Sequence, residues 1–202
     1  MQAVFLAINE KIKAIKEKGF VTKRDIFEWL EVIVTAMVAV VVVFTLVFKV
    51  VTIDGGSMRE TLHNGDKVVI SNLFYTPKQK DIVVISRNID NSYESESQAP
   101  IIKRVIATEG QIVDIDFNTG MVYVDGVALD EPYTRTPTNL SYDIQFPVKV
   151  DDGCVFVLGD NRNDSHDSRS SLIGNNGMID TRYILGKAIL KVFPFSEIGG
   201  IE

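Results

Sequence analysis

A run of 17 residues without a charge, Val32 to Phe48, sets the first limit on the architecture of this chain. As a helix it would span about 25 Å, against a hydrocarbon core of about 30 Å, and Val50 and Val51 extend its apolar length. The run is longer than the apolar region of a usual signal peptide, and no small-x-small cleavage site follows it. We therefore expect one uncleaved membrane anchor, over residues 30–50, rather than a leader peptide or the core helix of a soluble domain.

Basic residues are distributed unequally around this run. The segment before it contains Lys11, Lys13, Lys16, Lys18, Lys23 and Arg24, whereas few basic residues follow it closely. Because an excess of Lys and Arg marks the cytoplasmic side, we expect residues 1–29 in the cytoplasm and residues 51–202 outside it. Residues 1–18 have helical apolar spacing, which is typical of an amphipathic helix on the inner leaflet or of a solvated helix. The protein is thus predicted to cross the cell membrane once, with the lipid bilayer as a partner.

Composition excludes some classes of function. The 202-residue chain has a net charge of -6 and no basic stripe interleaved with aromatic residues, which argues against a nucleic-acid partner. Cys154 is the only cysteine, so no internal disulfide can form, and its apolar neighbours predict a buried side chain. The length beyond the anchor suits one moderate or two small domains.

Short apolar segments separated by turn signals predict a mainly β, antiparallel fold for residues 51–202. Helical periodicity is nearly absent there, and turn pairs such as Asp125-Gly126 divide the segments. Residues 110–150 are expected to form a smaller β subdomain inserted into the larger domain, with surface excursions at 87–100 and 130–147. The expected strands are 67–70, 81–86, 101–108, 111–115, 121–124, 126–129, 155–158 and 184–193.

A small polar turn, Gly55 to Met58, lies shortly after the apolar run. Its two glycines leave the backbone bare, so a substrate chain can approach the Ser57 hydroxyl, and the Ser57 amide can donate to a developing oxyanion. Taken alone, the segment is equally consistent with a glycine-rich turn between the anchor and a first strand.

Lys103 places a positive charge inside the apolar strand Ile101 to Ile106. A lysine at its ordinary pKa of about 10.4 is charged at neutral pH and cannot act as a base. Burial disfavours the ammonium, and lowering the pKa by two or three units requires about 3–4 kcal/mol of differential interaction. A serine with a desolvated lysine is a known nucleophile and base pair, whereas an edge lysine that discourages strand aggregation is the alternative.

A dense polar loop, Gly159 to Arg169, follows the apolar strand at 155–158. Its many hydrogen-bonding groups can orient a neutral lysine and hold a neighbouring loop. Ser165 is expected to reach the amine, and Asp167 to pair with Arg169.

Two other types of site use residues of the same regions. A Ser-His-Asp triad would recruit His63 or His166, although neither imidazole needs a catalytic role. A calcium loop would draw on the aspartates of the polar loop, but Arg162 in its middle and the missing EF-hand pattern disfavour it. No phosphate-binding loop or zinc spacing is present, so we expect no metal and no cofactor. The aspartates of the calcium alternative are Asp160, Asp164 and Asp167.

Taken in order, these motifs resemble the conserved boxes of the bacterial type I signal peptidases, in particular the Gram-positive branch. The likeness covers the chain from the anchor onward. The matching segments are Ser57-Met58 with Thr61-Leu62 and Gly65-Asp66, then Lys103 to Ile106, Gly159 to Asn161 with Ser165 and Asp167 to Arg169, and Gly186 to Ala188.

The resemblance implies a β-rich catalytic domain with a smaller β subdomain. It implies that Ser57 is the nucleophile and Lys103 the general base, that Ser165 positions the lysine amine, and that Asp167 and Arg169 brace the site. Gly56, Met58 and Asp160 complete the set of supporting residues.

Two positions depart from the family pattern. Arg59-Glu60 occupies the place where the family usually has a proline, which removes a rigid backbone angle and adds a carboxylate. Gly55 stands where some members carry a serine that donates to the oxyanion. These differences bear on the range of substrates more than on the type of reaction.

The sequence thus predicts a membrane-bound serine endopeptidase that removes N-terminal signal peptides from exported preproteins. One alternative is an accessory protein on the same scaffold that binds an exported surface subunit and assists its assembly with little or no cleavage. Another is a self-cleaving transcriptional regulator with a related Ser-Lys site, which would need a DNA-binding segment where this chain has its anchor.

Overall fold

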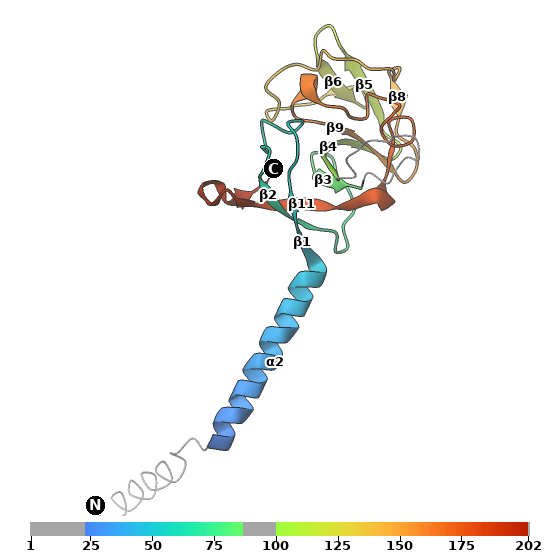
Figure 1. Cartoon of the computed structure of the whole chain (residues 1–202). Helices are drawn as coiled ribbons and strands as arrows, with labels where there is room; N and C mark the ends of the chain where they lie inside the picture. The colour runs from blue at the N-terminus through green and yellow to red at the C-terminus, as the bar shows by residue number, and fades with distance from the viewer. Residues whose placement is uncertain (1–22, 87–99, 202) are drawn as a thin grey trace, which may run out of the picture. The chain divides into compact units, whose positions relative to one another are not determined.

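The computed structural model describes residues 23–86 and 100–201 (Figure 1). These residues divide into two units, which meet in the chain at Leu46 and Val47. The first contains helix α2, Lys23–Val47, and the second is a β domain. The predicted helix at 1–18 and nearly all of the predicted excursion at 87–100 lie outside the described residues.

Helix α2 contains a 20-residue stretch, Ile26–Thr45, that is long and apolar enough to cross a membrane, and none of it is buried against the rest of the protein. The helix begins and ends earlier than the predicted anchor at 30–50. It ends at Val47 because strand β1, Phe48–Thr52, pairs with strand β2, Lys67–Ser71. Val50, the last residue of the predicted anchor, and Val51, which we counted as extending its apolar length, belong to this strand.

The larger sheet is antiparallel and runs in the order β1-β2-β11-β3-β4-β9-β10, with β12 paired to β11. The prediction of an antiparallel, mainly β fold is therefore confirmed. The remaining strands of this sheet are β3 (Ile82–Ile85), β4 (Ile101–Thr108), β9 (Cys154–Leu158), β10 (Ile179–Asp180), β11 (Ile184–Phe193) and β12 (Gly199–Gly200).

A second antiparallel sheet has the order β7-β6-β5-β8. Its strands are β5 (Ile112–Asp116), β6 (Met121–Val124), β7 (Val127–Ala128) and β8 (Val148–Lys149), so they fall within the range predicted for the smaller subdomain. Single-turn 3-10 helices connect strands of the domain: η1 (Arg162–Asp164), η2 (Thr181–Tyr183) and η3 (Phe195–Glu197).

The two sheets share a hydrophobic core. Val113 and Val122 of the second sheet pack with Ile106 of β4 and with Phe156 and Leu158 of β9 in one buried cluster. The smaller sheet is therefore attached through the same strands that carry the polar loop after β9. β4 itself extends from Lys103 toward this shared core.

Candidate active site

The segment that carries Ser57 is a closed loop between β1 and β2. Its ends are joined because Ile53 N donates to Asp66 O at 2.8 Å and Gly65 N donates to Ile53 O at 2.9 Å. Met58 and Leu62 are completely buried in the core beneath β2, β3 and β4. Ser57 therefore lies on a short turn that is held against the sheet by the buried side chains of Met58 and Leu62.

Lys103 contacts this serine from β4. Its Nζ donates a hydrogen bond to Ser57 Oγ at 2.7 Å and another to Ile102 O at 3.1 Å. Lys103 is only 4% exposed, and Val105 and Ile106 beside it are completely buried. Desolvation of this kind disfavours the charged form of an amine. The structure therefore brings the predicted pair into direct contact, within the distance that proton transfer requires.

The polar loop after β9 holds the backbone on both sides of the nucleophile. Asn161 N donates to Ser57 O at 3.0 Å, and Asn161 Nδ2 donates to Gly56 O at 3.0 Å. Gly159 allows the two segments to approach, since a Cβ at this position would lie 2.5 Å from Ser57 O. Asn161 was part of the motif in the sequence, but its contact with Ser57 was not predicted.

Asp167 and Arg169 form the expected ion pair and are both completely buried. Arg169 Nε donates to Asp167 Oδ1 at 2.8 Å, and Arg169 Nη2 donates to Asp167 Oδ2 at 2.9 Å. Asp167 Oδ2 also accepts from Gly159 N at 3.0 Å, which links the pair to the loop beside Ser57. A bidentate contact of this kind fixes the orientation of the two side chains as well as the distance between them.

Ser165 lies in the site, but without the contact that we expected. Its Oγ is buried and makes no hydrogen bond with any residue in the described part of the chain. A Cβ on Gly159 would lie 2.2 Å from this oxygen, so the hydroxyl is packed against the same glycine that approaches Ser57. The proposed role of Ser165 in holding the lysine amine stays a prediction.

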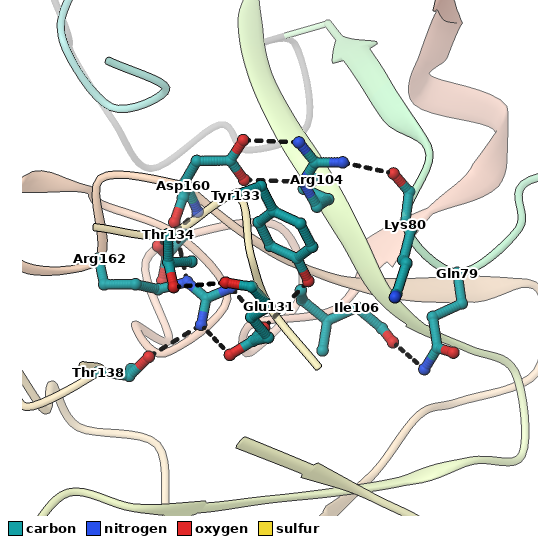
Figure 2. Close-up of polar contacts among 12 residues, drawn as sticks. Gln79, Lys80, Arg104, Ile106, Glu131, Tyr133, Thr134, Thr138, Asp160 and Arg162 are labelled. Atoms are coloured by element: carbon teal, nitrogen blue, oxygen red, sulfur yellow. Dashed lines mark hydrogen bonds and ion pairs between the residues drawn. The ribbon is translucent and has the colours of Figure 1, made fainter. Parts of the chain in front are cut away.

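Two further arginines stabilise the site, and sequence reasoning missed their roles. Arg104 Nε and Nη2 donate to the two oxygens of Asp160 at 2.8 and 2.7 Å, and Arg104 Nη1 donates to Lys80 O at 2.9 Å (Figure 2). Thr61, from the loop that carries Ser57, donates its hydroxyl to the same aspartate. The signal was present in the sequence, because Arg104 interrupts the same apolar strand as Lys103.

Arg162 connects the polar loop to the segment after β7. Its Nη1 and Nη2 donate to the carboxylate of Glu131 at 2.7 and 2.6 Å, and its Nε donates to Gly159 O at 3.1 Å. The ring of Tyr133 lies near both arginines, with its centroid 3.9 Å from Arg104 Cζ (Figure 2). Burial lowers the pKa of Arg162. The hydrogen bond of Arg162 to Glu131 and the charge of Glu131 together raise this pKa by more, so the net pKa lies above its usual value.

The other types of site considered from the sequence receive no support from this geometry. Neither His63 nor His166 hydrogen-bonds to Ser57 among the residues that the structure describes, and the His166 ring lies 5.1 Å from the Tyr142 ring between centroids, at an angle of 60°. The carboxylates of Asp160 and Asp167 are bound by arginines, and no group of three potential metal ligands occurs in residues 23–86 and 100–201.

A pocket of about 380 Å³ opens beside the Ser57 loop. Arg59, one of the two departures from the family pattern, lies in its wall, whereas the Glu60 carboxylate is 3.9 Å from Arg135 at the surface. An exposed pair at this distance contributes little to stability. The pocket is lined by Asp54, Gly55, Gly56, Arg59, His63 and Asn64.

Comparison with known proteins gives a consistent result. The profile of the family described as "Signal peptidase, peptidase S26" matches residues 26–193. A protein named signal peptidase I from Bacillus licheniformis is 32% identical over 194 residues, which cover 91% of this chain and 97% of that protein. A probable signal peptidase I-1 from Synechocystis sp. is 36% identical over 170 residues, covering 81% of this chain and 82% of the relative.

Among solved structures, the chain is similar to a crystal structure of a signal peptidase I from Enterococcus faecalis V583. The match has 24% sequence identity and a TM-score of 0.41, and it covers 56% of this chain and 97% of that one.

Proposed function

Because this chain belongs to the peptidase S26 family of signal peptidases, we propose that it is a membrane-anchored serine endopeptidase that removes N-terminal signal peptides from exported preproteins. Ser57 is the nucleophile and neutral Lys103 the general base. The observation that carries this proposal is the 2.7 Å contact between Ser57 Oγ and the Nζ of a lysine that is 96% shielded from water.

The reaction follows from this contact. Lys103 Nζ takes the proton of Ser57 Oγ as that oxygen attacks the carbonyl carbon of the scissile peptide bond. When the carbon–nitrogen bond breaks, the lysine returns the proton to the leaving amine, and an acyl-enzyme remains. Lys103 then takes a proton from water as the water oxygen attacks the ester carbonyl carbon. When the bond from that carbon to Ser57 Oγ breaks, Lys103 returns the proton to Ser57 Oγ, and the signal peptide leaves with a free carboxylate.

Two parts of the site support the charged intermediate and the substrate. The Ser57 amide is the proposed donor to the oxyanion, on a backbone whose position is set by Asn161. An extended substrate chain is expected to pair with the strands that flank Ser57, with small residues one and three positions before the cut. Asp167 and Arg169 position the polar loop, and no cofactor takes part.

We further propose that α2 is a single membrane anchor with residues before it in the cytoplasm, so that Ser57 acts at the outer face. An exported signal segment would then lie in the same bilayer as the anchor. The exposed apolar stretch Ile26–Thr45 supports the anchor, and the basic residues before it support the orientation.

Processing of a preprotein in membranes tests the catalytic pair. Ser57→Ala and Lys103→Met should each abolish cleavage, since one removes the attacking oxygen and the other the base. Lys149→Met, which removes an exposed lysine of β8, is the matched control and should cleave normally. Normal processing by either active-site variant would refute the pair. If the unmodified protein binds an exported subunit without cutting it, the accessory function is correct instead.

A further inference from the structure

The turn that carries Ser57 leaves one backbone donor without an acceptor. Gly56 O accepts hydrogen bonds from Asn161 Nδ2 at 3.0 Å and from Arg59 N at 3.1 Å, whereas no group in the described part of the chain accepts from Ser57 N. The Ser57 amide is therefore available to the negative oxygen that forms when Ser57 Oγ attacks a carbonyl carbon. Oxyanion sites usually combine such an amide with a second donor.

Gly55, two positions before Ser57, cannot supply this second donor. It has no side chain, and its φ of +100° is a backbone conformation that other residues seldom adopt. Its amide is already bound, because Gly55 N donates to Asn64 Oδ1 at 2.9 Å. A Cβ on Gly55 would meet no atom within 4 Å, so the space beside it is open. Gly55 thus forms part of the wall of the 380 Å³ pocket beside the loop.

Arg59 brings a guanidinium to the same pocket. Its side chain runs back toward Gly56, since a Cβ on Gly56 would lie 3.6 Å from Arg59 Nη2 and 3.8 Å from Arg59 Cζ. Covalent geometry puts Ser57 N no more than about 4 Å from that Cβ position, so the guanidinium and the Ser57 amide lie within roughly 8 Å of each other. Rotation of the exposed Arg59 side chain can bring both groups within hydrogen-bond distance of one oxygen.

The guanidinium of Arg59 is not engaged elsewhere. It makes no hydrogen bond or ion pair within residues 23–86 and 100–201. Two carboxylates lie nearby: Asp54 lines the same pocket, and Asp164 Oδ2 lies 3.7 Å from the Gly56 Cβ position, where it accepts from Asn161 Nδ2 at 3.3 Å. Their charges oppose a negative oxygen beside Ser57, and the permanent charge of Arg59 offsets them.

We propose that Arg59 is a catalytic residue that binds the oxyanion together with the Ser57 amide. As the bond from Ser57 Oγ to the carbonyl carbon forms, the electron pair of the carbonyl double bond moves to the carbonyl oxygen, and the Ser57 proton passes to Lys103 Nζ. The guanidinium donates to the negative oxygen until the carbonyl group forms again. This inference rests on the proposed function, and it gives a role to a position at which the loop departs from the family pattern.

Kinetics of cleavage test this role. Arg59→Ala should lower kcat on a signal-peptide substrate by about 100-fold with little change in KM, because the contact forms only in the transition state. Arg59→Lys keeps the charge without the fork of donors and should recover part of the loss. Arg135→Ala is the matched control, since Arg135 is also exposed and lies 3.9 Å from Glu60, and it should keep its kcat. Each variant should unfold at the temperature of the parent.

A peptide boronic acid gives a measurement that does not need cleavage. The probe is a short peptide that ends in the boronic acid analogue of alanine. Boron bonds to Ser57 Oγ, the Ser57 proton passes to Lys103, and one hydroxyl of the resulting tetrahedral anion occupies the place of the oxyanion. Arg59→Ala should bind this probe about 100-fold more weakly than the parent, whereas Arg135→Ala should bind it equally well. Millimolar guanidinium chloride, but not sodium chloride, should restore part of the affinity of Arg59→Ala.

Three results would overturn the inference: an Arg59→Ala protein with the parent's kcat and boronate affinity, a rise in KM alone, or an equal loss in Arg135→Ala. The proposed function fails separately. A parent protein that binds the boronate but cleaves no signal-peptide substrate would contradict the proposed function, and the boronate affinity of Arg59→Ala would still decide the role of Arg59. A parent that forms no adduct would contradict both.

Discussion

The position of the Ser57 hydroxyl depends on a residue that has no side chain. Gly159 lies between Ser57 O and Ser165 Oγ, at distances that leave no space for a methyl group. Its amide is bound by Asp167 and its carbonyl by Arg162, so the backbone cannot move aside without breaking a buried contact. One glycine therefore links the nucleophile to two ion pairs, Asp167 with Arg169 and Arg162 with Glu131.

Gly159→Ala should reduce cleavage by about 100-fold or more, because the new Cβ must push the Ser57 backbone away from Lys103. The measurement is kcat on a preprotein or signal-peptide substrate in detergent. Gly199→Ala is the control, since a Cβ there meets no atom within 4 Å and should leave kcat unchanged. Unaltered cleavage by Gly159→Ala would show that the loop tolerates displacement and that the contact with Asn161 does not position Ser57.

At the scale of elements, the loop from Ile53 to Asp66 is held at its end by the side chain of Asp66. Asp66 accepts a hydrogen bond from His63 N at 2.8 Å and pairs with Lys191 of β11 at 2.9 Å. Burial raises the pKa of Asp66, but the His63 amide and Lys191 lower it more, so its net pKa lies below the usual value. The pKa of Lys191 is raised by the same pairing and by Glu197, against a burial that lowers it.

The stability that ionised Asp66 contributes should therefore be lost in acid. A carboxyl with a depressed pKa in the folded state stabilises the fold above its unfolded pKa of about 3.9, and this stabilisation disappears as the pH falls through the folded pKa. Asp66→Asn should be less stable than the parent by about 2 kcal/mol at pH 7, and the difference should shrink below about pH 4. Thermal unfolding from pH 7 to pH 3 measures it, and a difference independent of pH would contradict this account.

The segment that follows β7 acts as a second support for the site. Glu131 binds Arg162, and the Tyr133 ring covers Arg104 while its hydroxyl donates to Glu131 at 3.1 Å. The pKa of Tyr133 is raised by burial and by the charge of Glu131, so the hydroxyl stays protonated. The smaller sheet is thereby joined to the polar loop by charges as well as by the shared apolar core.

Tyr133→Leu should destabilise the protein by about 1–2 kcal/mol, because it removes the aromatic face that Arg104 contacts. Tyr133→Phe keeps that face and loses only the bond to Glu131, so it should cost less. The midpoints of thermal unfolding of the two variants give the comparison. Equal losses for the leucine and phenylalanine variants would mean that the hydroxyl, not the ring, provides the stabilisation.

For the whole molecule, the two units have different physical requirements. The exposed apolar surface of α2 suits a lipid environment, whereas the β domain buries a hydrophobic core of its own. The chain passes directly from helix α2, which ends at Val47, to strand β1, which begins at Phe48. The proposed orientation follows from the basic residues before α2 rather than from the fold.

Thiol accessibility in right-side-out membrane vesicles tests this orientation. In the Cys154→Ala background, Val127→Cys should react with a membrane-impermeant thiol reagent added outside. Gln2→Cys should react only after the membrane is permeabilised, because the lysine-rich segment is expected inside. The opposite pattern would reverse the topology and place Ser57 in the cytoplasm, where it could not cut an exported signal segment.

The local features of this protein were predictable from its sequence. An uncharged valine-rich run, alternating apolar segments and turn pairs depend on residues close together in the chain, and they indicated the helix, the antiparallel sheets and strands such as β4 and β11. Ser57 and Lys103 were also proposed there as a catalytic pair, because a hydroxyl after two glycines and a charge within an apolar strand are visible without a structure.

Only the tertiary structure decided how these parts meet. Helix α2 ends at Val47 because the residues after it form β1, which pairs with β2. Strand β2 begins at Lys67, 15 residues after the end of β1 at Thr52. The tertiary structure also paired Arg104 with Asp160 and Arg162 with Glu131, and left Ser165 Oγ without the expected lysine contact. The partner of a buried charge is the opposite charge that lies close to it in the folded chain. Sequence periodicity indicates only which residues are buried, so it does not reveal these partners.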